Sequence, residues 1–230
     1  MKASENLWEL EDVVATRQLD HRKSRVADAN AEAKLTNELL RELAKAPQEF
    51  FSKLVDAVLE FSAADSAGIS LLDEKEKTFV WPAVTGGLSP YVGAGTPMKF
   101  GPCGTVLDRD TTMLFSHPER YFTYLQPITP PLEEVLLVPF HVNHKAMGTI
   151  WAVIHDPIRK FDREDRRLLE TLSQFAASAY RVLTETGVLQ TIIDQLPRHP
   201  SPRRLIQEDG VFRFENRSSP GGVDLPASVR

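Results

Sequence analysis

Hydrophobic positions between residues 46 and 185 recur at the spacings of both helices and strands. The first helical stripe follows Pro47, a residue that suits the first turn of a helix, and consists of Phe51, Leu54, Val55, Val58 and Leu59. A longer stripe at the same spacing consists of Leu168, Leu169, Leu172, Phe175, Ala176, Ala179 and Leu183. Asp162 is placed to cap this second helix, and Asp165 completes a capping box. Each helix therefore has one apolar face to bury.

Between the two helices, five stretches are predicted as strands: 66–72, 78–84, 112–116, 134–142 and 146–155. Pro82 places the second strand at an edge or a bulge, because proline cannot donate a ladder hydrogen bond. Residues 105–109 are expected to form one or two helical turns, and 85–104 and 116–131 to form irregular loops. This order predicts an α+β fold, with helices on one face of a central antiparallel sheet of five or six strands and loops over the other.

The last two strands present two faces of different character. Their even-numbered positions are uniformly apolar and consist of Leu136, Val138, Phe140, Gly148, Ile150, Ala152 and Ile154. Their odd-numbered positions mix aromatic, polar and titratable groups and consist of Leu137, Pro139, His141, Thr149, Trp151, Val153 and His155. Ligand sites are mostly apolar with a few placed polar groups, so the mixed face under the irregular loops is the predicted pocket. We expect it to be lined by Phe79, Trp81, Cys103, Phe115, Tyr121, Tyr124, Leu137, Pro139, Thr149, Trp151 and Val153.

Several pocket candidates have two interpretations that the sequence leaves open. Trp81 and Trp151 are pocket walls or plain core beneath a loop. Tyr121 and Tyr124 offer hydroxyls to a ligand or, slightly favoured, anchor their loop to backbone. Cys103 is a redox-sensing thiol or, as cysteine more often is, a small buried hydrophobe.

The histidines give weak signals. His117 precedes a proline in a loop, His155 begins a turn, and His141 and His144 bracket the last hairpin turn. No third ligand is apparent beside the last two, so no metal site is predicted.

Three segments flank the domain: the charged helical extension 1–45, the helical connector 186–196 and the tail 197–230. Leu35, Leu39 and Leu43 share one helical face, with too few heptads for a coiled coil. The proline-rich tail is expected to be mostly disordered, with a short hairpin around Asp209-Gly210.

Composition excludes several classes of protein. The chain has 230 residues, with Lys+Arg 27 and Asp+Glu 32, and a net charge of -5 gives no broad electrostatic reason to bind nucleic acid. A single cysteine excludes an intramolecular disulfide and a multi-cysteine zinc site. No run approaches the roughly 18 apolar residues of a membrane helix, and the N-terminus lacks the apolar run of a secretory signal. We expect a cytoplasmic protein that binds neither nucleic acid nor membrane.

Three stretches resemble the GAF domain family of small-molecule sensors, which is related to PAS domains. They are SAGISLL at 66–72, LLVPFHVNHKAMGTIWAVIHD at 136–156 and RKFDREDRRLLETLSQFAASAY at 159–180. GPCGTVLDR and SHPERYF are similar to segments of GAF domains found ahead of bacterial histidine kinases. The resemblance covers about residues 50–185 and implies a GAF/PAS-like fold with a ligand between the sheet and its loops. It also implies a homodimer formed through the terminal helices.

The chain departs from the best-known ligand-binding members of that family. Aligned on Phe161 and Asp165, it has Pro157, Ile158 and Arg166 where the cyclic-nucleotide-binding members have Asn, Lys and Glu, so cyclic GMP and cyclic AMP are disfavoured.

The cysteine pattern also differs from that of two GAF subfamilies. Cys103 is followed by Gly104 rather than by the histidine of the bilin-binding members. One cysteine does not suit the methionine sulfoxide reductases of this fold, which resolve a sulfenic acid with a second thiol.

We therefore expect a bacterial sensory module that acts in a two-component signalling system. It would bind a small molecule and signal through its terminal helices to a histidine kinase or another signalling partner in trans. The sequence names no cofactor, and it contains no nucleophile–base pair or phosphate loop that would predict an enzyme. The alternative is a ligand-free dimerisation or partner-binding module, such as a remnant of a kinase sensor.

Overall fold

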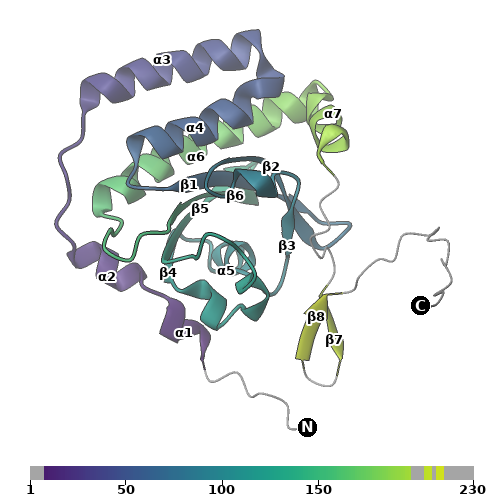
Figure 1. Ribbon diagram of the computed structural model, residues 1–230. Coiled ribbons are helices and arrows are strands. Elements are labelled where there is room, and N and C mark those ends of the chain that lie inside the picture. Colours follow the sequence, from purple (N-terminus) through teal and green to yellow (C-terminus); the bar gives the residue numbers. More distant parts are fainter. Residues whose placement is uncertain (1–7, 198–204, 209–210, 215–230) are drawn as a thin grey trace, which may run out of the picture.

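A six-stranded antiparallel sheet lies at the centre of the computed structural model, which describes residues 8–197, 205–208 and 211–214 (Figure 1). Its strands lie in the order β3 (Gly95–Pro97), β2 (Thr78–Gly86), β1 (Ser66–Asp73), β6 (Lys145–Ile154), β5 (Glu134–Val142) and β4 (Met113–Ser116). The predicted α+β architecture is confirmed. Two details were wrong within 85–104, which was expected to be entirely loop. It contains the three-residue β3, because so short a strand has no measurable alternation, and the helix expected at 105–109 begins there, at Pro102.

One face of the sheet is covered by α4 (Phe50–Phe61) and α6 (Arg163–Glu185), with α3 (Ala29–Lys45) outside α4 (Figure 1). Both strand faces predicted from residue parity are present in the structure. The even-numbered apolar positions of β5 and β6 belong to a core shared with the helices, here called the helix-side core, whose members include Leu54, Ile69, Leu136, Phe140, Ile150, Leu169 and Leu172. The predicted capping box of α6 is also present, since the Asp162 side chain accepts from the Glu164 and Asp165 backbone N–H groups.

The opposite face packs against α5 (Pro102–Arg109) and the irregular segments around it. Here a second cluster forms, the loop-side core, whose members include Phe79, Trp81, Cys103, Phe115, Phe122, Leu137, Trp151 and Val153. The bulge predicted at Pro82 is present, because the β1–β2 register shifts between Ile69, opposite Ala83, and Leu71, opposite Val80.

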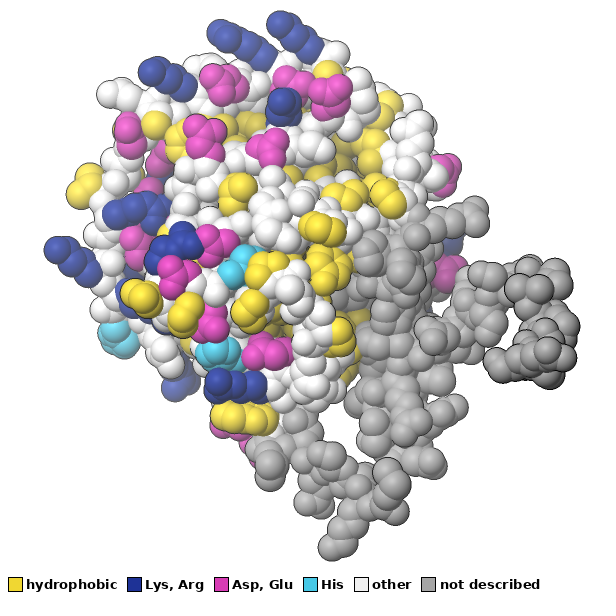
Figure 2. Space-filling view, in the orientation of Figure 1, with side chains coloured by type: hydrophobic (Ala, Val, Ile, Leu, Met, Phe, Trp, Pro, Cys, Tyr) yellow, Lys and Arg dark blue, Asp and Glu magenta, His cyan; other side chains and the backbone are white. Residues whose placement is uncertain are grey.

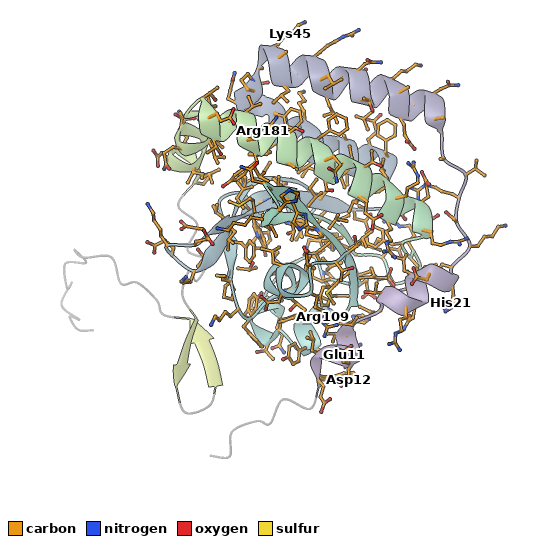
Figure 3. All side chains as sticks on the ribbon, turned by 180° about the vertical axis from the view of Figure 1, so that it is seen from behind. Glu11, Asp12, His21, Lys45, Arg109 and Arg181 are labelled. Carbon is orange, nitrogen blue, oxygen red and sulfur yellow. The ribbon has the colours of Figure 1, made fainter. Side chains whose placement is uncertain are left out.

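The N-terminal extension crosses from the loop side to the helix side. Helices α1 (Leu10–Val13) and α2 (Thr16–His21) precede α3, so the extension is not one continuous helix. Val14 pairs with Phe115 at the β4 edge, and the Ala15 N–H donates to the Leu114 carbonyl at 2.7 Å. Figure 3 shows Glu11 beside Arg109 of α5, with which it forms an ion pair.

Arginines of the linker between α2 and α3 fasten this extension to the domain. Arg22 donates to both oxygens of Glu134, at 2.7 and 2.9 Å, and Glu134 is only 1% exposed. Arg25 pairs with Asp162 at 3.1 Å and with the buried Asp165 at 2.7 Å. The polar run at residues 17–25 thus supplies two side chains, Arg22 and Arg25, to long-range ion pairs with the domain.

The C-terminal connector is the short helix α7 (Val188–Gln195), which follows α6 at Gly187, a residue with φ of 75°. The strands β7 (Leu205–Glu208) and β8 (Val211–Phe214) pair as the hairpin prediction required. Their Asp209-Gly210 turn and the rest of the tail, which was predicted to be disordered, lie outside the described residues. In the part of the chain that is described, each helix is too short or too polar to span a membrane.

Candidate functional site

A cavity of about 40 Å³ lies between the sheet and the loop-side segments. Its floor comes from three strands and consists of Trp81, Val135, Leu137, Trp151 and Val153. Its cover comes from residues 117–133, here called the covering segment, and consists of Pro118, Leu125, Ile128 and Leu132. Leu88, Thr96, Pro102 and Cys103 complete the wall.

Backbone hydrogen bonds make the covering segment a largely self-contained loop. The His117 N–H donates to the Glu133 carbonyl at 3.1 Å and so joins the two ends. Most backbone bonds inside the segment are local, such as Leu125 N–H to Phe122 and Ile128 N–H to Leu125. The segment is therefore held together mainly by bonds between its own residues.

The two tryptophans meet on the cavity floor. Their rings lie 5.2 Å apart between centroids at an interplanar angle of 59°. Trp151 lies across β1 because its cross-strand partner is Gly68, where a Cβ atom would lie 2.1 Å from the indole ring. Glycine is thus needed at this position for the indole to reach the cavity.

Polar groups form a small buried cluster beneath the tryptophans. The Trp151 indole N–H donates to the Ser70 hydroxyl at 2.9 Å, and the Cys103 sulfur lies 3.4 Å from the same oxygen. Burial raises the pKa of the Cys103 thiol, although the nearby Ser70, Thr149 and Thr96 hydroxyls act in the opposite direction. Since the thiolate is the reactive form, this cysteine is a poor nucleophile at neutral pH.

The Trp81 indole nitrogen, also on this side, has no hydrogen-bond partner among the described residues. The hydroxyls of Thr96 and Thr149 lie near the Cys103 thiol but form no hydrogen bond of normal geometry in the described structure. All three residues are buried, and two of them, Trp81 and Thr96, line the cavity.

Comparison with models of protein families identifies the family of this chain. A family model described as a GAF domain matches residues 44–180 of the 230-residue chain. The chain belongs to the GAF family. The GAF family is a family of sensory and regulatory domains of signalling proteins.

Solved structures agree on the fold. The GAF domain of a phosphoenolpyruvate-protein phosphotransferase from Coxiella burnetii is similar, with a TM-score of 0.58, 17% identity, and coverage of 70% of this chain and 99% of that one. The second GAF domain of DevS from Mycobacterium smegmatis has a TM-score of 0.51, 16% identity, and coverage of 62% and 99%. Free methionine-R-sulfoxide reductase from Neisseria meningitidis, an enzyme, has a TM-score of 0.53, 13% identity, and coverage of 72% and 99%. No curated protein matches the chain.

The structure of this GAF domain places the predicted pocket residues in four groups. Five of them line the cavity: Trp81, Cys103, Leu137, Trp151 and Val153. Thr149 is buried beside Cys103, below the lining. Phe79 and Phe115 are loop-side core, and Pro139 is buried in β5 without reaching the cavity. Tyr121 and Tyr124 pack against the same core and belong to an aromatic cluster with Phe100 and Phe122.

Sequence reasoning missed all four cover residues and one floor residue, Val135. Val135 has the same parity as Leu137 and was within reach of that argument. Leu125, Ile128 and Leu132 lie in irregular backbone, where no periodicity marks the inward side.

The histidines of the GAF domain lie at its edges. His155 is 2.7 Å from the Ser66 hydroxyl and 2.6 Å from the Pro131 carbonyl, so it joins β1 to the covering segment. His141 pairs with Asp110 at 2.5 Å on the surface, and His117 lies between Glu119 and Glu133. Within the described ranges, no three His, Cys, Asp or Glu side chains are grouped to hold a metal ion.

Proposed function

We propose that this GAF domain is a regulatory, non-catalytic sensor that binds a small molecule in the loop-side cavity. The observation that carries the proposal is a cavity beneath the covering segment, lined by the buried Trp81 nitrogen, which has no partner among the described residues, and by the buried Thr96 hydroxyl. Burying such atoms costs free energy unless something bonds to them, and ligand sites are where proteins accept that cost.

The sheet offers a route from the cavity to the terminal helices. Leu137 and Trp151 line the cavity, while their chain neighbours Leu136 and Ile150 pack in the helix-side core with α6. A ligand that shifts β5 and β6 would therefore move the surface on which α6 rests. We propose that α6 and α7 pass this change to a signalling partner in trans, in the cytoplasm, and that a histidine kinase is one such partner.

The alternative is a ligand-free dimerisation or partner-binding module, and the size of the cavity favours it. A volume of about 40 Å³ holds about three water molecules, so a larger ligand requires the covering segment to move. An exposed apolar side chain on the outer helix, Leu40 at 54% exposure, is available to a partner.

Native mass spectrometry of the protein purified from its own host, beside a denatured sample, tests the proposal. We expect an added mass that disappears on denaturation. Val153→Phe, which fills the cavity, should abolish that mass, whereas Val26→Phe at a site that is 93% exposed should retain it. A dimer with no added mass in wild type would favour the ligand-free module instead.

A further inference from the structure

The two tryptophans of the cavity floor differ in whether the indole N–H has a hydrogen-bond partner. The Trp151 N–H is bonded to Ser70, whereas the buried Trp81 nitrogen has no partner among the described residues. An indole N–H only donates hydrogen bonds. Trp81 is therefore satisfied only by a group that accepts one.

Thr96 lies on the same side of the sheet as Trp81. Thr96 on β3 pairs with Phe79 on β2, two residues before Trp81, and both Thr96 and Trp81 line the cavity. The Thr96 hydroxyl is also buried; it lies near the Cys103 thiol without a hydrogen bond of normal geometry, and it can donate or accept. An acceptor atom placed here would meet up to two donors.

The lining sets the charge of the ligand. Every described residue that lines the cavity is uncharged, and apart from the Trp81 nitrogen, the Thr96 hydroxyl and the Cys103 thiol the lining side chains are apolar or already bonded. A charged group buried without an opposite charge or hydrogen-bonding partners is strongly disfavoured. Phosphates, carboxylates and amines are therefore poor occupants.

We infer that the cavity takes an uncharged, mainly apolar and compact ligand whose hydrogen-bond acceptor, such as a carbonyl oxygen or a neutral ring nitrogen, bonds to the Trp81 indole N–H. The inference rests on the proposed function, since it names the ligand class of the same site. The apolar part of the ligand packs beside the two indoles, and the covering segment moves outward to admit the ligand.

Three probes of similar size separate the requirement for an acceptor from the requirement for zero charge. Acetophenone is a neutral acceptor, ethylbenzene is neutral and has no acceptor, and benzoate is a charged acceptor. Calorimetric titration of the full chain should show acetophenone binding and benzoate binding at least about tenfold more weakly, because its charge is not compensated. In Trp81→Phe, the affinity ratio of acetophenone to ethylbenzene should fall about fivefold, as expected for one lost hydrogen bond. Comparing the ratio removes the contribution of the lost ring area, which both probes share.

Two further variants keep the test decisive. Thr96→Val removes the second polar group with little change of shape and should lower the same ratio, so a Trp81 variant that fails to fold does not end the test. Thr171→Val, at an exposed site on α6, is the control for Thr96→Val and should leave the ratio unchanged.

An unchanged ratio in both cavity variants, or tighter binding of benzoate, would overturn the inference while leaving a small-molecule sensor intact. Absence of binding by all three probes would also overturn it. The native mass experiment judges the proposed function separately, because it depends on no choice of probe.

Discussion

The two faces of this one sheet are built differently. The helix-side core consists of hydrophobic side chains packed between β-strands and long helices. The loop-side core contains the cavity, the two tryptophans, the only cysteine and the buried polar atoms of Trp81, Thr96 and Thr149 that form no hydrogen bond of normal geometry in the described structure. The helix side therefore supplies stability, and the loop side keeps unmet bonding capacity that suits recognition.

The outer helix α3 presents charged side chains to solvent (Figure 2). Figure 2 shows Lys and Arg side chains along the edge of the molecule where Figure 1 places α3. This outer helix is attached through ion pairs such as Arg167–Glu32, and only a narrow face that includes Leu35 and Leu39 is buried.

Adjacent leucines on β5 give the largest expected contrast. Leu136 is in the helix-side core and Leu137 lines the cavity, and both are almost completely buried. Leu136→Ala should lower the free energy of unfolding by about 3–5 kcal/mol, and Leu137→Ala by about 2 kcal/mol, because Leu137 already borders a void. Urea denaturation of both variants measures the difference. Equal losses would mean that the two faces are equally well packed.

Breaking the Arg22–Glu134 pair should give the next largest effect, because this pair fastens the segment that joins the two faces. Arg22→Ala leaves the buried Glu134 with the Phe161 backbone N–H at 3.1 Å and Lys160 at 3.6 Å, but without its guanidinium partner. We expect a loss of about 2–3 kcal/mol, below the value for a fully buried pair because Arg22 is 20% exposed. Arg17→Ala, an exposed arginine of the same segment, is the matched control. A loss no larger than the control's would contradict this role of the N-terminal extension.

The tryptophans allow a finer comparison within the loop side. Trp151→Phe removes a bonded N–H and leaves Ser70 without its donor, while Trp81→Phe removes an N–H that has no described partner. We expect Trp151→Phe to cost about 1–2 kcal/mol more than Trp81→Phe. Thermal and urea unfolding provide the values, and a Trp81 variant that is the less stable of the two would show that its N–H is bonded in solution.

The smallest expected effect concerns how the stability of the protein changes at low pH, through Asp65, which directly precedes β1. Burial alone would raise the pKa of Asp65, but hydrogen bonds from the His155 backbone and from Arg159 hold it below its ordinary value of 3.8. A carboxyl with a lowered folded-state pKa adds stability above its unfolded pKa, and this stability is lost as pH falls through the folded value. Asp65→Asn should therefore lose less stability than wild type below about pH 4. Asp56→Asn, at an exposed site on α4, is the control.

Local patterns predicted much of the fold. The alternation in β5 and β6 separated the two faces, and Asp162 and Asp165 marked the start of α6. The contact of Arg22 with Glu134 joins residues 112 positions apart, and a local pattern carries no information on such pairs. The same limit applies to the site. Cavity residues on the strands could be predicted from residue parity, whereas the residues of the covering segment could not.

Native-state hydrogen exchange, with and without acetophenone, tests most directly whether the loop side opens for a ligand while the helix side stays closed. Amides of residues 117–133 should exchange much faster than those of α6, and acetophenone should slow the exchange of the covering segment. Exchange of both regions at one common rate, with no added protection of the covering segment, would contradict the account.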